Sequence, residues 1–135
     1  MKCVLDASVI VKWFLDDDPE EKHIKEAKEV FDRVQQGEDE VVQPVHWRVE
    51  VLSVIVRKEP GKVEEAIKLL DLLAFSVMDN WELHIRAAQL SQRYNHHLFD
   101  TLYHAVALES GARLVTADRK YARKAMGEGA MELLG

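Results

Sequence analysis

Four carboxylates in this chain are placed where they could do chemistry. Asp6 and Asp118 each follow a short apolar run, Glu50 is the only charge between residues 49 and 56, and Asp100 begins a segment that is nearly all apolar. Carboxylate oxygens and water are the ligands that Mg²⁺ and Mn²⁺ prefer. Metal ions held there could activate water and stabilise the leaving oxygen in phosphodiester cleavage. The four acids are therefore candidates for a divalent-metal site.

Each acid also has a plainer explanation. Asp6 and Asp118 can accept hydrogen bonds from the first amides of a helix, and for Asp118 alone this interpretation is the stronger one. Glu50 can lie at the rim of its helix beside Arg57, and the charge of Asp100 can stabilise a helix N-terminus. Taken together the four favour a site, because carboxylates brought close together repel one another unless cations neutralise them.

Two hydroxyl residues accompany these acids. Ser8 follows Asp6 by two residues, and Thr116 precedes Asp118 by two. The same pairing of an acid with a hydroxyl therefore occurs at the ends of two predicted strands. We expect both hydroxyls to orient ligands or bound water.

Three histidines lie near Asp100 in the sequence. His104 is one turn after it on the same predicted helix, which indicates either an ion pair or support for a metal from outside its ligands. His96 and His97 invite a zinc interpretation, but an adjacent pair cannot easily share one tetrahedral site. We interpret this pair as part of a polar loop.

Other chemistries have no anchor in the sequence. It contains no Gly-x-Gly-x-x-Gly or Gly-Lys-Ser/Thr pattern for phosphates and no Gly-x-Ser-x-Gly pattern for a serine nucleophile. Cys3 is the single cysteine, which excludes an internal disulfide and a cysteine metal cluster. The net charge of −6 argues against a general electrostatic binder of nucleic acid, although a basic rim around an acidic cleft is compatible with it.

Length and composition predict one folded domain covering residues 1–135. The chain is long enough for a real core, and 47% of its residues are hydrophobic. No apolar run approaches the roughly 20 residues of a membrane helix. The start of the chain lacks the longer apolar segment of a signal peptide. We therefore expect a cytoplasmic protein that is not associated with a membrane.

Strands and helices are predicted to alternate along the chain. Strands are expected at residues 3–5, 41–42, 75–78, 114–116 and 131–134. The first helix is expected at residues 9–15 with Ser8 as its cap, and the acidic run at residues 16–18 should end it. A second helix should then start with Asp18 as N-cap and Glu21 completing a capping box, and end at Gly37.

Four further helices and a short basic one complete the pattern. The third helix is expected at residues 44–59, and the fourth follows the break at Pro60-Gly61 with Val63, Ile67 and Leu70 on one face. The fifth should follow a cap at Asp79, and the sixth is expected at residues 99–110. The short basic helix should start at Asp118. Alternating strands and helices predict a parallel sheet covered on both faces. Right-handed crossovers then bring the strand ends, Asp6 among them, to one edge of the sheet.

The acids lie in segments that resemble the PIN-domain ribonucleases, and within them the small VapC toxins of prokaryotic toxin–antitoxin pairs. The resemblance covers nearly the whole chain, and four segments carry it: Val4-Leu5-Asp6-Ala7-Ser8-Val9; Glu50 in the helix opened by Pro44; Phe99-Asp100-Thr101-Leu102-Tyr103 followed by Ala105-Val106-Ala107; and Thr116-Ala117-Asp118-Arg119-Lys120-Tyr121. His104 stands where the family often has a neutral residue, and the region of His96-His97 varies in it.

The resemblance implies a three-layer α/β/α sandwich with a central, mainly parallel sheet. It implies an endoribonuclease dependent on Mg²⁺ or Mn²⁺, a homodimer, and a toxin whose cognate antitoxin blocks the acidic cleft. In this interpretation Asp6 and Asp100 hold the principal metal, and Glu50 and Asp118 complete a second site or position the attacking water. Candidate contacts to RNA phosphates are Lys12, Arg119, Lys120, Arg123 and Lys124.

Two rival functions stay open at this point. The first is a non-catalytic PIN-fold module that binds RNA or a protein partner through the acidic cleft. The second is a phosphohydrolase that uses a nucleophilic Asp at a strand end. That chemistry usually needs another acid two residues after the first, and here that residue is Ser8.

Overall fold

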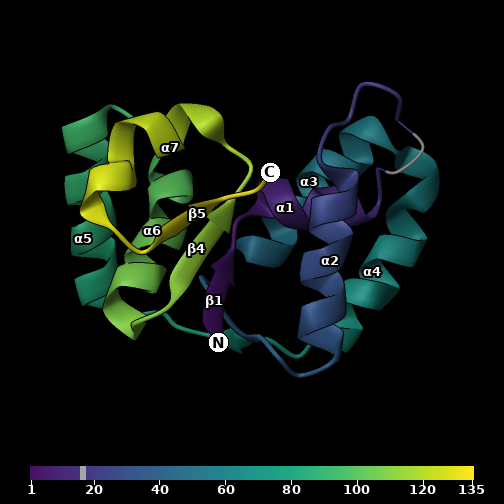
Figure 1. The fold of residues 1–135 in the computed structure, drawn as a ribbon, viewed down its shortest axis with the longest axis horizontal. Coiled ribbons are helices and arrows are strands. Elements are labelled where there is room, and N and C mark those ends of the chain that lie inside the picture. The colour runs from purple at the N-terminus through teal and green to yellow at the C-terminus, as the bar shows by residue number, and fades with distance from the viewer. Residues whose placement is uncertain (16–17) are drawn as a thin grey trace.

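A five-stranded parallel sheet lies at the centre of the computed structural model, which describes residues 1–15 and 18–135 (Figure 1). The strand order is β3-β2-β1-β4-β5. The strands are β1 (Lys2–Leu5), β2 (Glu40–Gln43), β3 (Ser76–Val77), β4 (Arg113–Thr116) and β5 (Met131–Leu133). The predicted strands are thus confirmed to within two residues at each end, and β1 lies in the middle of the sheet.

Helices cover both faces of this sheet and give the three-layer α/β/α arrangement that the sequence predicted. Figure 1 shows α5, α6 and α7 on one side of the molecule and α2, α3 and α4 on the other. The α-helices in the described residues are α1 (Ala7–Ile10), α2 (Ile24–Gln35), α3 (Trp47–Lys58), α4 (Val63–Leu72), α5 (Trp81–Tyr94), α6 (Leu98–Ser110) and α7 (Arg119–Ala125). Three single turns of 3₁₀-helix are η1 (Val11–Trp13), η2 (Pro60–Lys62) and η3 (Met126–Glu128).

Helix α6 contributes more buried residues than any other helix in the described residues. It packs against β1, β2, β4 and α5. Tyr103 and the three residues 105–107, which are Ala, Val and Ala, are fully buried. The small alanines let the helix lie close to the sheet. Gly111 ends the helix with φ of 69°, a left-handed conformation that glycine adopts at little cost.

The side chain of Gln43 holds the carboxyl end of β1 in place. The N–H of Leu5 donates to Gln43 Oε1 over 2.8 Å, and Gln43 Nε2 donates to the carbonyl of Leu5 over 2.9 Å. The side chain of Gln43 thereby supplies the hydrogen bonds of a strand neighbour, and it is fully buried. The backbone just before Asp6 is held from both sides as a result.

The first helix starts earlier than predicted, and its cap is a different residue. Helix α1 begins at Ala7 and gives way to the 3₁₀ turn η1 at Val11. Asp6 is the N-cap, and its carboxylate accepts the N–H of Ser8 over 3.2 Å. Ser8 is therefore inside the helix instead of capping it, because the shorter link from the strand leaves Asp6 at the capping position.

The predicted start of the second helix is wrong. Helix α2 begins at Ile24, after His23 in a left-handed conformation. Asp18 instead accepts the N–H of Glu20 in a turn, and Glu21 is bound to Lys12, so the capping box does not form. The predicted break at Asp16 and Asp17 lies outside the described residues.

Smaller differences occur at three later helices. Helix α3 starts at Trp47, three residues after Pro44. The N-cap of α5 is Asn80, whose amide oxygen accepts the N–H of Leu83 over 2.9 Å, and not Asp79. In α4 the predicted apolar face is partly wrong, because Ile67 is half exposed while Ala66 and Leu70 are buried. No helix in the described residues is long and apolar enough to cross a membrane.

Candidate metal centre at the carboxyl edge of the sheet

Asp6 lies at the carboxyl end of the central strand, as the sequence predicted. Its backbone N–H donates to the carbonyl of Val115 over 3.0 Å, which continues the pairing of β1 with β4. Its carboxylate accepts a hydrogen bond from the Ser8 hydroxyl as well as from the Ser8 N–H. Asp6 is only 8% exposed, so a charge there is largely withdrawn from water. The helix-cap and site interpretations both apply to this residue.

The hydroxyls of Ser8 and Thr116 connect Asp6 to the end of β4. Thr116 Oγ1 lies 3.4 Å from Asp6 Oδ2 and accepts the N–H of Asp118 over 3.0 Å. Ser8 Oγ accepts the N–H of Ala117 over 3.0 Å. Two strand ends that are more than 100 residues apart in the chain are thereby locked into one edge.

Asp118 is half-buried at the start of α7. It is the N-cap of that helix, and its Oδ1 accepts the N–H of Tyr121 over 3.0 Å. The other oxygen, Oδ2, lies 3.4 Å from His96 Nε2. One oxygen therefore serves the helix and the other faces the cleft.

Glu50 comes to the same region from α3. Its Oε2 lies 3.2 Å from His46 Nε2, one turn earlier. The same ring nitrogen lies 2.9 Å from the carbonyl of Phe99. Since a carbonyl only accepts, His46 Nε2 carries the proton. His46 thereby ties α3 to the start of α6, and sequence reasoning did not find this residue.

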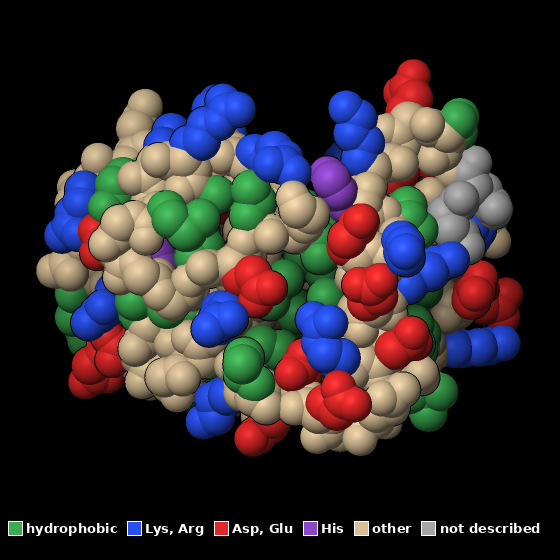
Figure 2. Space-filling model, viewed as in Figure 1, with side chains coloured by type: hydrophobic (Ala, Val, Ile, Leu, Met, Phe, Trp, Pro, Cys, Tyr) green, Lys and Arg blue, Asp and Glu red, His purple; other side chains and the backbone are tan. Residues whose placement is uncertain are grey.

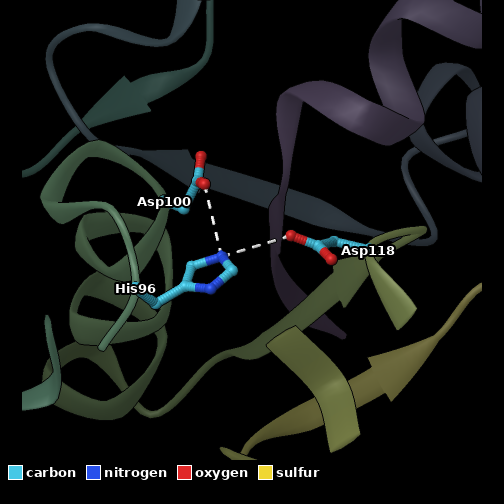
Figure 3. A group of neighbouring side chains, drawn as sticks. All are labelled: His96, Asp100 and Asp118. Atoms are coloured by element: carbon cyan, nitrogen blue, oxygen red, sulfur yellow. Dashed lines mark ion pairs between the residues drawn. The ribbon is translucent and has the colours of Figure 1, made fainter. Parts of the chain in front are cut away.

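Asp100 lies in the first turn of α6 with its side chain about one third exposed. Its Oδ2 is 3.3 Å from His96 Nε2. Figure 3 shows His96 between the two carboxylates of Asp100 and Asp118, with one ring nitrogen directed at both. The ligand atoms of these three residues all lie within 4.8 Å of one another.

Electrostatic coupling joins the four predicted acids into one group. Burial raises the pKa of Asp6 to about 7; the hydrogen bonds from Ser8 oppose this shift, while the charges of Glu50 and Asp100 add to it. Burial also raises the pKa of Asp100, and the charges of Glu50 and Asp118 add to that shift. The charges of the neighbouring acids therefore disfavour the ionisation of Asp6 and Asp100, as expected of carboxylates that share a site.

Tyr103 is a further group of this site that the sequence did not reveal. Its hydroxyl is buried on α6, and burial together with the charges of Glu50 and Asp6 raises its pKa. The phenol stays protonated and is a hydrogen-bond donor among acceptors. The periodicity of α6 predicted only an apolar core residue at this position.

His104 neither pairs with Asp100 nor supports it, so both alternatives predicted for this histidine are wrong. Its Nε2 bonds to the carbonyl of Gly129 and its Nδ1 to the hydroxyl of Tyr121, both over 2.8 Å. The histidine that faces Asp100 is His96, which the sequence assigned to a polar loop. His96 follows a left-handed residue, Asn95, and the chain reversal there turns its ring toward the acids.

The basic residues predicted to contact RNA differ in their positions. Lys12 is 7% exposed, and its ammonium binds the carboxylate of Glu21 and the carbonyl of Lys22, which argues against a phosphate contact. Arg119 and Lys120 are exposed at the start of α7. Figure 2 shows Lys and Arg side chains gathered over the α7 half of the molecule, beside a hollow in the surface.

The donor set at this edge suits a divalent cation. Asp6, Glu50 and Asp100 are hard oxygen donors whose mutual repulsion a cation would relieve. Within the described part of the chain, no hydrogen bond satisfies the buried Nε2 atom of His96, although two carboxylates lie near it. An unsatisfied buried nitrogen beside repelling acids is expected where a cation binds.

Residues 3–126 match a family model described as the PIN domain. Three solved structures match nearly the whole chain at low identity. A toxin–antitoxin complex from Klebsiella pneumoniae has a TM-score of 0.67 and 16% identity, and the match covers 96% of this chain and 95% of that one. No match is found among curated proteins.

The other two structures are similar in extent. VapBC2 from Rickettsia felis, bound to a DNA fragment from its promoter, has a TM-score of 0.67 and 12% identity, with 100% of both chains covered. VapBC-1 from nontypeable Haemophilus influenzae has a TM-score of 0.63 and 17% identity, with 98% of this chain and 96% of that one covered. At these identities the likeness concerns the fold.

Proposed function

This chain belongs to the PIN-domain family, and we propose that it is a divalent-metal-dependent endoribonuclease of the VapC type, the toxin of a toxin–antitoxin pair. One observation carries the proposal: at the carboxyl edge of a parallel sheet, burial raises the pKa values of Asp6 and Asp100, and the charge of the neighbouring Glu50 adds to both shifts. Ligands of open α/β sheets bind at that edge.

In this proposal the four acids have different roles. Asp6 and Asp100 hold the principal cation, Mg²⁺ or Mn²⁺, and Glu50 and Asp118 complete a second site or orient the attacking water. When bound, the cation supplies charge stabilisation for the phosphate and a more acidic water molecule. Ser8 and Thr116 hold the Asp6 carboxylate in place through their hydroxyls.

The substrate we propose is single-stranded RNA. The described chain carries exposed cations beside the acidic edge at Arg119, Lys120 and Arg123 of α7. Such side chains can bind phosphates and draw the polyanion toward a cleft that would otherwise repel it. We do not include Lys12 among these contacts, because its ammonium is already bound inside the protein.

Two protein partners belong to the proposal. An antitoxin would cover the acidic cleft. A groove with apolar residues Trp13, Phe14, Phe31 and Leu69 and charged residues Lys28, Asp32 and Glu65 is suited to an amphipathic segment of it. A second copy of this chain would cover apolar residues that are exposed near the site, among them Val45, Val49 and Phe99. We propose that the pair acts in the cytoplasm.

The test is RNA cleavage by the purified, antitoxin-free protein. With Mn²⁺ it should cut single-stranded RNA, and Asp6→Asn should lower the rate by about 10³-fold, the loss expected when metal charge stabilisation is impaired. Asp71→Asn, an exposed acid on α4, is the matched control and should cleave like the parent.

Two results would contradict the proposal. If Asp6→Asn cleaves as well as the parent, the acids are not the catalytic groups. If the parent binds RNA with or without Mn²⁺ but never cuts it, the chain is a binding module that uses the cleft without catalysis. Hydrolysis of small phosphate esters in place of RNA would indicate a phosphohydrolase.

A further inference from the structure

His96 differs from the other histidines near the site because one nitrogen of its ring faces two carboxylates, those of Asp100 and Asp118. Its side chain is nine-tenths buried, with Nε2 lying 3.3 Å from Asp100 Oδ2 and 3.4 Å from Asp118 Oδ2 (Figure 3). No residue that the structure describes gives this nitrogen a hydrogen bond. A buried polar atom in this condition needs an explanation.

We propose that His96 is a nitrogen ligand in a cation site with Asp100 and Asp118, and that this site prefers a first-row transition metal, for which Mn²⁺ is the probe, over Mg²⁺. The inference rests on the metal dependence proposed above. It adds a ligand that the four-acid interpretation does not contain, and it decides between the two cations named there.

The backbone around His96 is held in place for this role. Its N–H donates to the carbonyl of Ser91 over 3.1 Å, and its own carbonyl accepts the Ser91 hydroxyl over 2.5 Å. Lys124 Nζ donates to the carbonyl of the preceding residue, Asn95, over 3.2 Å. The ring of Tyr121 packs against the imidazole with centroids 4.7 Å apart. The imidazole therefore has little freedom to turn into solvent.

The distances suit one coordination sphere after a small adjustment. Two ligand atoms that each lie about 2.1 Å from an ion are at most about 4.2 Å apart. The two separations from His96 Nε2 are within that limit, and all three ligand atoms lie within 4.8 Å of one another. A rotation of one of the two carboxylates, each about one third exposed, would bring the set together.

His46 does not compete for this assignment. Its Nε2 carries a proton that it shares with the carbonyl of Phe99 over 2.9 Å, so that atom has no lone pair to offer. His97 is exposed and next in the chain, which makes it the matched control for His96. Arginine and lysine side chains offer no lone pair either, and among the described residues His96 is the nitrogen donor that faces both Asp100 and Asp118.

The nature of the donors sets the metal preference. Mg²⁺ prefers oxygen ligands and keeps much of its water, whereas imidazole suits transition metals. Replacing one carboxylate or water by imidazole therefore favours Mn²⁺ over Mg²⁺. The alternative is an imidazolium that bridges Asp100 and Asp118 as an ion pair and binds no metal. The two cases differ in what contacts Nε2.

Pulsed electron paramagnetic resonance of the Mn²⁺-loaded full chain distinguishes them. We expect a ¹⁴N coupling typical of imidazole, which His96→Gln removes and His97→Gln retains. In competition titrations of Mn²⁺ against Mg²⁺, His96→Gln should lower the preference for Mn²⁺ by about tenfold, a typical effect of altering the surroundings of a metal. The new amide oxygen would suit Mg²⁺ better than the imidazole does.

A second measurement uses the unmodified chain, in case His96→Gln does not fold. Titration with diamagnetic Zn²⁺ should shift the ¹⁵N resonance of His96 Nε2 and leave His97 unchanged. Absence of both the coupling and the ¹⁵N shift would overturn the proposal and establish an ion pair only. If the protein still cleaves RNA with Mg²⁺ in that event, the proposed nuclease function stands without the His96 site. If the nitrogen coordinates Mn²⁺ but RNA is not cleaved, the nuclease function is contradicted and the His96 site stands.

Discussion

Two buried polar regions meet at helices α6 and α7, and they differ in how their groups are satisfied. One is centred on His104, between α6 and the loop that precedes β5. The other is the acidic cleft of Asp6, Asp100 and Asp118 at the carboxyl edge of the sheet. Tyr121 touches both, because its hydroxyl bonds to His104 and its ring packs on His96.

In the His104 region both ring nitrogens have a hydrogen-bond partner. The carbonyl of Gly129 only accepts, so His104 Nε2 carries the proton and Nδ1 accepts the hydroxyl proton of Tyr121. One neutral tautomer therefore satisfies both ring nitrogens. Burial lowers the pKa of His104, which keeps this neutral form.

In the acidic cleft, by contrast, buried polar atoms of the described residues lack such a partner. Burial raises the pKa of Asp6 to about 7, and the charges of Glu50 and Asp100 raise it further instead of balancing it. His96 adds a buried nitrogen without a hydrogen bond among the described residues. Groups left in this state cost stability, which a protein accepts where a ligand will complete them. The contrast is between a polar region whose groups satisfy one another and one whose groups a bound cation would complete, as we propose for the cleft.

The largest effect should come from removing the charge of Asp6. With metal chelated at pH 8, Asp6→Asn should raise the free energy of unfolding by about 2–4 kcal/mol, because a pKa shift of one unit corresponds to about 1.4 kcal/mol. Denaturant titrations at pH 8 measure this. The same variant should lose RNA cleavage, so we expect stability and activity to change in opposite directions.

The pH dependence of the free energy of unfolding follows from the raised pKa of Asp6. Below the ordinary pKa of 3.8, Asp6 is protonated in both the folded and unfolded states and carries no penalty. As pH rises toward about 7 the unfolded chain ionises first, so the parent loses stability over this range and Asp6→Asn does not. Equal stability of the two proteins at pH 8 would show that the cleft is already neutralised by other groups.

A substitution in the His104 region should have a smaller effect on the free energy of unfolding, and should lower it. His104→Leu should lower the free energy of unfolding by about 2–3 kcal/mol, because the hydroxyl of Tyr121 and the carbonyl of Gly129 lose their partner. The Mn²⁺ affinity of the folded protein should stay within about twofold, since His104 does not face the acids. Denaturant titration and Mn²⁺ resonance measure the two quantities.

His84 provides the control for that substitution. It is an exposed histidine on α5 whose Nε2 lies 2.8 Å from Asp79. His84→Leu should cost less than about 1 kcal/mol, as is typical of surface ion pairs. A similar loss in both variants would mean that the His104 hydrogen bonds contribute nothing beyond those of a surface pair.

The sequence reveals one kind of region better than the other. Asp6, Glu50 and Asp100 could be predicted as a group because each is a charge in an apolar run, and because parallel strands end at one edge. His96 could not, since its direction depends on the left-handed turn at Asn95 and its contact with Asp118 spans 22 positions of the chain. Residue type and spacing do not encode that turn.

The same limit explains the errors at the start of the chain. Asp18 and Glu21 have the spacing of a capping box, but Glu21 is taken by Lys12, and α2 starts later. Lys12 looks like a surface cation on a short helix, yet the buried pair it forms is a tertiary contact. Local patterns predict strands well here because β1, β2 and β4 are short and largely buried, whereas helix starts depend on competition between partners.

The smallest effect concerns the residue that joins the two regions. Tyr121→Phe removes the proton donated to His104 Nδ1 and keeps the ring that packs on His96. We expect a loss of about 1–2 kcal/mol in the free energy of unfolding, because one buried acceptor is left without its donor. The Mn²⁺ resonance should not change, since the ring still holds the imidazole. A changed Mn²⁺ spectrum would show that the His104 hydrogen bond positions His96, and that the structural region also serves the cleft.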